Sequence, residues 1–106
     1  HQPDMVFQKH VHNAFTGTGL DRWLRERDIN SVIICGIRTE QCCETTARVA
    51  SDLGYAVTFV SEATLTFPMT YKGITLSAAE IRHRTETVLS GRFAEIKTVA
   101  ETLESL

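Results

Sequence analysis

The hydrophobic pattern of the chain alternates between short apolar runs and segments with helical spacing. Residues 32–35 (VIIC) form a mainly β-branched run without polar alternation, which is typical of a strand covered on both faces. From Thr39 onward, apolar residues recur at helical spacing until Gly54, a residue type that commonly ends helices. The chain therefore passes from a buried strand into a helix at Gly36, with almost no loop between them.

The same alternation continues over the rest of the chain. Short strands are predicted at residues 5–7, 55–60 and 93–97. Helices are predicted to begin at capping boxes, in which a Ser or Thr precedes an acidic residue by three positions, at Thr18, Ser77 and Thr98. Alternating strands and helices with right-handed crossovers predict a Rossmann-like parallel α/β sheet with helices flanking both faces, a three-layer arrangement.

Residues 63–75 are predicted to form a longer connection between the strand at 55–60 and the following helix. Phe67, Pro68, Met69 and Tyr71 give this segment apolar bulk above the strand ends. Two interpretations remain open for that bulk, since aromatic residues in a long loop either form the wall of a pocket or anchor the loop to the protein.

Cys42 is the candidate nucleophile of the chain. It falls in the first turn of a predicted helix, at the carboxyl end of a buried strand, where open α/β sheets bind ligands. Unpaired amides and the helix dipole stabilise an anion at such a position and so favour the reactive thiolate. A buried cysteine more commonly serves as a small apolar side chain, and this interpretation fits Cys35 and Cys43.

The composition narrows the classes of function. The length of 106 residues and the 42% hydrophobic content predict that residues 1–106 form one domain. The net charge of −2 favours neither nucleic acid nor an anionic membrane as partner. There is no secretory apolar segment and no apolar run of membrane length. Three cysteines do not make an even disulfide framework, and their spacing matches no zinc motif. A reduced, cytoplasmic protein is expected.

Lys9 lies two residues after the predicted strand at residues 5–7. A lysine at a strand exit is usually solvated, whereas burial is what lowers the pKa of a lysine into a catalytically useful range. The residues around Lys9 therefore give little support by themselves for a catalytic role. His10 and His12 alternate with Lys9, but a histidine pair without further ligands is a weak metal signal. We expect His12, together with Phe15 from the loop that follows, to lie at a substrate pocket.

Residues 36–64 (GIRTEQCCETTARVASDLGYAVTFVSEAT) resemble the signature of the isochorismatase-like cysteine hydrolases, which include nicotinamidases, isochorismatases and N-carbamoylsarcosine amidohydrolases. The motif positions that match in register are Gly36, Thr39, Cys42, Thr46 and Ala47. Upstream, the residues that match the family's segment around its catalytic lysine are Asp4, Val6, Lys9, Ala14, Phe15, Thr18 and Leu20. Downstream, Thr85, Leu89, Phe93 and Ala94 resemble the family's final helix and strand.

The resemblance implies a Cys-Lys-Asp arrangement that hydrolyses small amides, ureas or, as in isochorismatase, a vinyl ether. Cys42 would attack the carbonyl carbon, and Lys9 would help to hold the thiolate. Backbone amides of Arg38 or Thr39 and of Cys42 would bind the oxyanion. The resemblance also points to a cis peptide between Ile37 and Arg38. It implies no cofactor and leaves no metal site within this chain.

The sequence departs from the family pattern at two places. Glu62 stands where the family usually has aspartate. In addition, the family's first strand, which carries the catalytic aspartate, precedes anything present here, and Asp4 does not replace it. We therefore expect an incomplete domain with residues 5–9 as an orphan edge, in a sheet order that resembles 3-2-1-4-5-6. Such a chain would be inactive and poorly folded by itself.

The partners expected from these observations are a small-molecule substrate, an amino-terminal segment or companion chain that supplies the aspartate, and further copies in a homo-oligomer. A second class of function stays open beside the hydrolase. In that alternative the chain is a non-catalytic α/β module that binds an anion or a protein partner at the amino terminus of the Cys42 helix.

Overall fold

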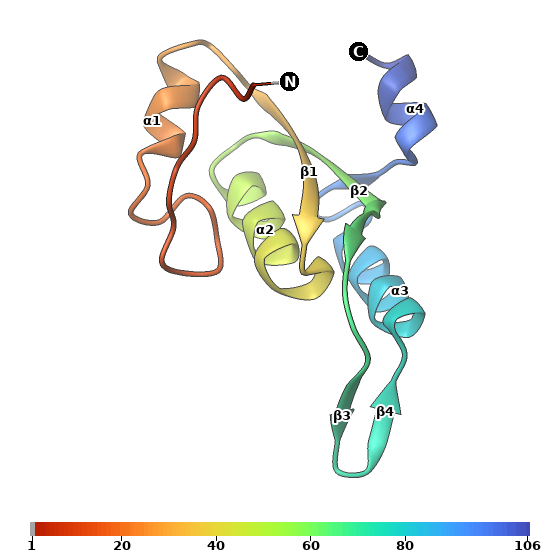
Figure 1. The fold of residues 1–106 in the computed structure, drawn as a ribbon. Coiled ribbons are helices and arrows are strands. Elements are labelled where there is room, and N and C mark those ends of the chain that lie inside the picture. The colour runs from red at the N-terminus through yellow and green to blue at the C-terminus, as the bar shows by residue number, and fades with distance from the viewer. Residues whose placement is uncertain (1) are drawn as a thin grey trace.

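A computed structural model describes residues 2–106, and Figure 1 shows the arrangement of its helices and strands. In chain order the elements are α1 (Leu20–Arg25), β1 (Ser31–Ile37), η1 (Thr39–Cys43), α2 (Glu44–Asp52), β2 (Ala56–Leu65), β3 (Met69–Tyr71), β4 (Ile74–Leu76), α3 (Ala78–Leu89), β5 (Glu95–Ile96) and α4 (Val99–Glu104). Element η1 is a π-helical turn that leads directly into α2. None of the helices within residues 2–106 combines the length and apolar character needed to cross a bilayer.

The main sheet is parallel, with strand order β1-β2-β5. Residues Ser31 to Ile34 of β1 pair in register with Ala56 to Phe59 of β2, and the register shifts before Gly36. The predicted parallel α/β sheet is therefore confirmed. The outer edge of β1 has no neighbouring strand among the residues that the structure describes.

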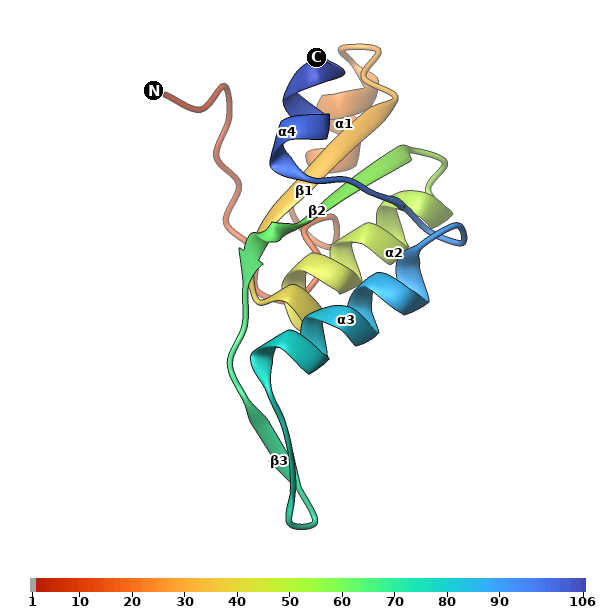
Figure 2. The ribbon, with the colours of Figure 1, turned by 90° about the vertical axis from the view of Figure 1, so that its right-hand side faces the viewer.

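Helices α2 and α3 cover one face of this sheet, while α4 lies on the other face (Figure 2). The core lies between the sheet and α2, where the fully buried Ala47 and Ala50 allow the helix backbone to approach the strands closely. Phe59 of β2 and Leu89 of α3 are also completely buried and fill the centre of this layer. Leu24 extends the core to α1.

The prediction that residues 32–35 are covered on both faces is wrong. Ile34 is buried in the core, but Ile33 is 49% exposed and Cys35 is also exposed. Successive side chains of a strand point to opposite faces, and the short helix α4 packs over β2, so the far side of β1 stays open.

The prediction of a strand at residues 5–7 is also wrong. These residues form no strand, because no other described strand lies beside them to accept and donate backbone hydrogen bonds. The segment is held by a side chain instead, since the Phe7 ring packs edge-on against Trp23 with 6.3 Å between ring centroids. At residues 93–97, only Glu95 and Ile96 are in a strand.

The capping boxes predicted at Ser77 and Thr98 are both present, each with reciprocal hydrogen bonds to the glutamate three residues later. The box predicted at Thr18 is absent, because α1 is capped by Gly19. The Thr18 hydroxyl instead donates to the carbonyl of Ala14 at 2.6 Å and so closes the preceding loop.

Residues 63–75 do not form the predicted loop. Strand β2 continues to Leu65, and β3 and β4 then form an antiparallel hairpin that extends away from the sheet and helices (Figures 1 and 2). Its two-residue turn is Lys72-Gly73, and both residues have positive φ angles of 50° and 77°. Such turns match the natural twist of a hairpin, and a glycine flanked by alternating apolar residues is the sequence signal for one.

Glu44, in the first turn of α2, connects that helix to α3 through one buried and one partly buried hydrogen bond. Its Oε1 accepts from Arg84 at 2.6 Å and from the Thr85 hydroxyl at 2.8 Å, while Oε2 accepts from Arg48 at 3.2 Å. Thr85 is completely buried, so its hydroxyl depends on this carboxylate for a partner. Glu44 therefore fixes the start of α2, two residues after Cys42, against the body of the protein.

We expect the Glu44→Ala substitution to lower the free energy of unfolding by about 2–3 kcal/mol, because it leaves the buried Thr85 hydroxyl unpaired. Glu44→Gln keeps one acceptor and should cost roughly half as much. Chemical denaturation of the purified full-length protein measures both effects. The control is Glu26→Ala, which removes an exposed ion pair with Arg22 and should change stability by less than about 0.5 kcal/mol. Equal effects at Glu44 and Glu26 would contradict this account.

Candidate active site

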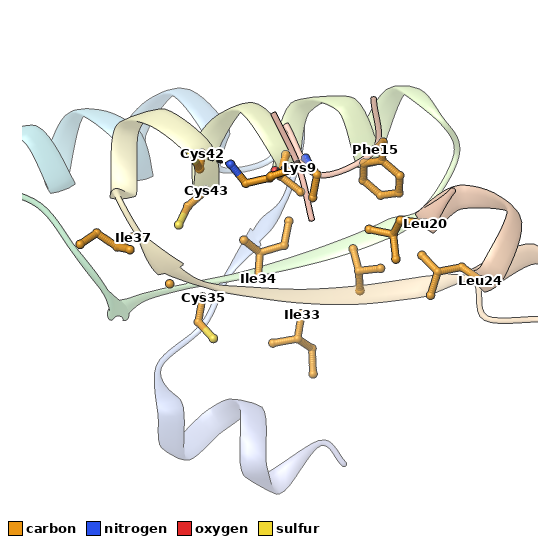
Figure 3. A pocket seen from close by; sticks show the side chains of 14 residues that line it. Lys9, Phe15, Leu20, Leu24, Ile33, Ile34, Cys35, Ile37, Cys42 and Cys43 are labelled. Atoms are coloured by element: carbon orange, nitrogen blue, oxygen red, sulfur yellow. Dashed lines mark hydrogen bonds between the residues drawn. The ribbon is translucent and has the colours of Figure 1, made fainter. Parts of the chain in front are cut away.

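Lys9 and Cys42, which lie 33 residues apart in the sequence, meet in the structure (Figure 3). The Lys9 ammonium donates a hydrogen bond to Cys42 Sγ at 3.1 Å and a second one to the carbonyl of Val11 at 3.1 Å. The bond to Val11 holds the end of the lysine side chain in place. Lys9 is exposed, so its position beside the thiol, rather than burial, distinguishes it from other surface lysines.

The end of β1 places Cys42 where the sequence predicts it, in the first helical turn after the strand. Gly36, with φ of 129°, adopts a backbone conformation that strains other residues. The Ile37–Arg38 peptide is cis, as expected from the sequence. The carbonyl of Arg38 then accepts from the amides of Gln41 and Cys43, both at 3.2 Å, which closes the η1 turn around Cys42.

Thr39 secures this turn from the inside. Its side chain is completely buried, and its hydroxyl is 2.6 Å from the hydroxyl of Thr64 at the end of β2. Arg38 points its guanidinium over the ring of Phe67, 4.9 Å from the centroid. The three residues expected to supply oxyanion-binding amides, Arg38, Thr39 and Cys42, thus lie in one short segment at the strand end. Their role in binding an oxyanion stays a prediction.

A second set of contacts brings the lysine segment to the helix. The amide of Ala14 donates to the hydroxyl of Thr46, one helical turn beyond Cys42, at 3.0 Å. Within the loop, Asn13 Oδ1 accepts from the amides of Phe15 and Thr16 at 3.0 and 2.9 Å. Thr46 is one of the residues that match the family motif, and its hydroxyl fixes the loop after Lys9 against α2.

A cavity of about 430 Å³ lies beside the Lys9–Cys42 pair and follows the edge of β1. Most of its wall is apolar, with Phe15, Leu24 and Ile34 among the residues that line it. Phe15 is one of these lining residues, and its part in binding a substrate stays a prediction. His12 is exposed and is not among the residues that line the cavity.

The three thiols have different surroundings. Cys43 is buried, with 4% of its surface exposed, and burial raises the pKa of its thiol to about 11. Its packing role is as predicted. Cys35, expected to be buried, is exposed on the opposite side of β1 from Cys42 (Figure 3). Cys42 is partly exposed beside Lys9.

Two further features of the site concern polar side chains. Glu40, in the first turn of η1, accepts from the Thr66 hydroxyl at 2.6 Å through Oε1, while its buried Oε2 has no hydrogen-bond partner within residues 2–106. Across the same residues, no group of three or more His, Cys, Asp or Glu side chains is arranged to hold a metal ion.

Comparisons with known proteins agree with this geometry. Residues 1–93 match the family model described as the isochorismatase domain. The chain is 33% identical over 96 residues to the isochorismatase family protein YrdC of Bacillus subtilis, covering 90% of this chain and 51% of YrdC. It is 42% identical over 65 residues to nicotinamidase 3 of Arabidopsis thaliana, covering 61% of this chain and 33% of that enzyme.

Among solved structures, a cysteine hydrolase from Pseudomonas syringae pv. phaseolicola superimposes with a TM-score of 0.90 and is 33% identical in sequence. The match covers 95% of this chain and 48% of that one. The chain therefore spans about half the length of YrdC and of this hydrolase.

We expect the three thiols to be alkylated at different rates by iodoacetamide at neutral pH. Cys42 should react fastest because it is accessible and has the Lys9 ammonium beside it, and Cys35 should react like an ordinary exposed thiol. Cys43 should be slowest, because it is buried and its raised pKa of about 11 keeps the thiol protonated at neutral pH. Peptide mass spectrometry over a time course gives the three rates. Equal labelling of Cys42 and Cys43 in the folded protein would contradict the assignment.

Proposed function

The chain belongs to the isochorismatase family of hydrolases, and on that basis we propose that the protein uses Cys42 to hydrolyse a C–N bond in a small amide or carbamoyl compound. The observation that carries this proposal is the 3.1 Å hydrogen bond from Lys9 to Cys42 Sγ at the edge of an apolar cavity. A cation beside an accessible thiol at a strand-to-helix junction favours the nucleophilic thiolate.

In the proposed reaction, the Cys42 thiolate attacks the carbonyl carbon and the carbonyl oxygen becomes an oxyanion. The oxyanion collapses, the C–N bond breaks, and the nitrogen leaves as an amine that takes up the proton given by the thiol. The acyl group then remains on Cys42 as a thioester. Water hydrolyses the thioester to a carboxylic acid and restores the thiol. Amides in the segment from Arg38 to Cys42 are the proposed donors to the oxyanion.

The proton transfer requires a carboxylate, and the described residues that line the cavity include none. We propose that the aspartate implied by the family resemblance enters the site from a further polypeptide segment, of the same chain or of a companion chain. The outer edge of β1 is where such a segment would pair. It has no strand neighbour among residues 2–106, and Ile34 and Ile37 of β1 line the same cavity.

The cavity favours a small substrate with an apolar part. Its volume of about 430 Å³ is within the range of small-ligand sites, and its wall is largely aliphatic and aromatic. The relative from Arabidopsis thaliana is named a nicotinamidase, which is consistent with an amide of this size as the substrate class. A vinyl ether like isochorismate is the alternative. The bond that breaks in a vinyl ether has no carbonyl carbon at which the thiolate could be acylated, so its hydrolysis would leave no acyl group on Cys42.

We expect full-length protein incubated with a panel of small amides to hydrolyse at least one of them. The Cys42→Ala substitution should lower the rate at least about 1,000-fold, because it removes the nucleophile. Rapid acid quenching followed by mass spectrometry should reveal an acyl adduct on the peptide that contains Cys42.

The matched control is Cys35→Ala. Cys35 also lines the cavity but lies on the other side of β1 from Cys42, so this change leaves the nucleophile in place and should keep most of the activity. Turnover that survives Cys42→Ala would contradict the proposed nucleophile. Product formed from a vinyl ether without any adduct would move the substrate to that alternative class. A folded protein with no turnover on the whole panel would favour the non-catalytic binding module.

A further inference from the structure

Arg38 carries a positive charge at the turn that holds Cys42. It caps the start of η1, and its carbonyl accepts the amides of Gln41 and Cys43, the neighbours of Cys42 on either side. Its side chain lies over the ring of Phe67, with 4.9 Å between the guanidinium carbon and the ring centroid. Within residues 2–106 the guanidinium forms neither a hydrogen bond nor an ion pair. Its charge is therefore not neutralised by any described acidic side chain.

The other arginines that stack on aromatic rings are each bonded to an oxygen of the protein as well. They are Arg25, Arg27 and Arg48, and their acceptors are Asp21, the Trp23 carbonyl and Glu44. An aromatic ring attracts a guanidinium but offers no oxygen to accept its N–H groups. Arg38 therefore keeps its donors for an acceptor that lies outside the described chain.

Arg38 is held in place at the strand end before a ligand binds. Glu40 Oε1 accepts from the Thr66 hydroxyl at 2.6 Å, which fixes the residue before Phe67 to the η1 turn. The other oxygen of Glu40 is buried, and this carboxylate makes no ion pair with Arg38. Arg38 is half-buried and Phe67 is 42% exposed, so a ligand can reach both. A side chain that is already ordered loses less entropy when it binds a ligand.

The charges around Cys42 favour an anionic ligand. Lys9 and Arg38 place two cations at this end of β1, and no carboxylate is among the described residues that line the cavity. The aspartate that we propose to enter from a further segment would balance one of these cations. A carboxylate is the anion whose two oxygens match the paired N–H groups of a guanidinium.

We propose that Arg38 selects the substrate by binding a carboxylate, so that the preferred substrates are small amides that carry a carboxylate at their other end. This selection rests on the proposed hydrolysis at Cys42. In the bound substrate the amide carbonyl carbon meets Cys42 Sγ, while the carboxylate accepts N–H groups from the Arg38 side chain. Water then replaces the amide nitrogen, so the products are a dicarboxylate and ammonia.

The first test compares succinamate with butyramide, which share a carbon skeleton and differ in a terminal carboxylate or methyl group. Glutaramate and valeramide form a second pair that is one methylene longer. For full-length wild type, kcat/KM should be at least about 30-fold higher for the carboxylated member of one pair. Arg38→Gln should lower that kcat/KM at least about 30-fold and change the value for the uncharged member less than about threefold.

Two further variants show whether the guanidinium itself is responsible. Arg38→Lys should keep part of the preference, because it keeps the charge but lacks the paired donors. Arg27→Gln removes an arginine that stacks on Trp23, and it should change neither kcat/KM. Equal kcat/KM values within both pairs for the wild type, or equal losses on both members in Arg38→Gln, would overturn the assignment.

The second test needs no turnover, so it separates the role of Arg38 from the proposed hydrolysis. Iodoacetate and iodoacetamide both alkylate a thiolate by displacing iodide, but only iodoacetate carries a carboxylate. At low ionic strength the iodoacetate-to-iodoacetamide rate ratio should be higher at Cys42 than at the exposed Cys35. Arg38→Gln should lower the ratio at Cys42 at least about threefold, while Arg27→Gln leaves it unchanged.

The outcomes of the labelling experiment are distinct from those of the amide panel. A ratio at Cys42 that is unchanged in Arg38→Gln would overturn the anion site, even in a protein that hydrolyses amides. A ratio that falls in a protein that hydrolyses no amide would support Arg38 as an anion site and reject the proposed hydrolase.

Discussion

The hydrogen bond between Lys9 and Cys42 is the contact on which the rest of the site depends, because it joins two segments that lie far apart in the sequence. The segment around Lys9 forms no strand among the described residues, so backbone pairing does not place it. It is placed by side-chain contacts: Phe7 packs on Trp23, and Ala14 donates to Thr46. Thr46 lies on the helix that continues from Cys42, so the loop and the nucleophile share one rigid support.

The position of Cys42 is fixed by the junction at which β1 turns into a helix without a loop. Thr39 is completely buried and bonded to Thr64, while Glu44 ties the start of α2 to α3 through Arg84 and Thr85. Cys42 lies between these two anchors. A thiol held in this way can keep its direction toward the cavity while a substrate enters, which is the condition for efficient attack by a positioned group.

Local signals in the sequence are enough to predict the parallel sheet, the helix start at Cys42 and the capping boxes at Ser77 and Thr98. Each of these depends on neighbours within a few residues. The predictions that failed concern features set by distant parts of the chain, such as which face of a strand is covered and which way a loop side chain points. Cys35 is exposed because α4 covers β2 rather than β1, and His12 faces solvent because a loop sets its direction. Residues 5–7 form no strand, since a strand exists only with a partner. The hairpin at residues 69–76 does have a local signal, the Lys72-Gly73 turn, but the apolar bulk around it also fits a loop.

If Lys9 activates Cys42, the alkylation rate of Cys42 in full-length protein depends on the Lys9 ammonium. Lys9→Met removes the ammonium but keeps a side chain of similar length, and Lys72→Met removes a lysine remote from the thiol as the control. Lys9→Met should slow iodoacetamide labelling of Cys42 by about fivefold to tenfold at pH 7, the size expected for one solvent-exposed hydrogen bond. Lys72→Met should have no effect. An unchanged labelling rate in Lys9→Met would show that Lys9 does not activate the thiol.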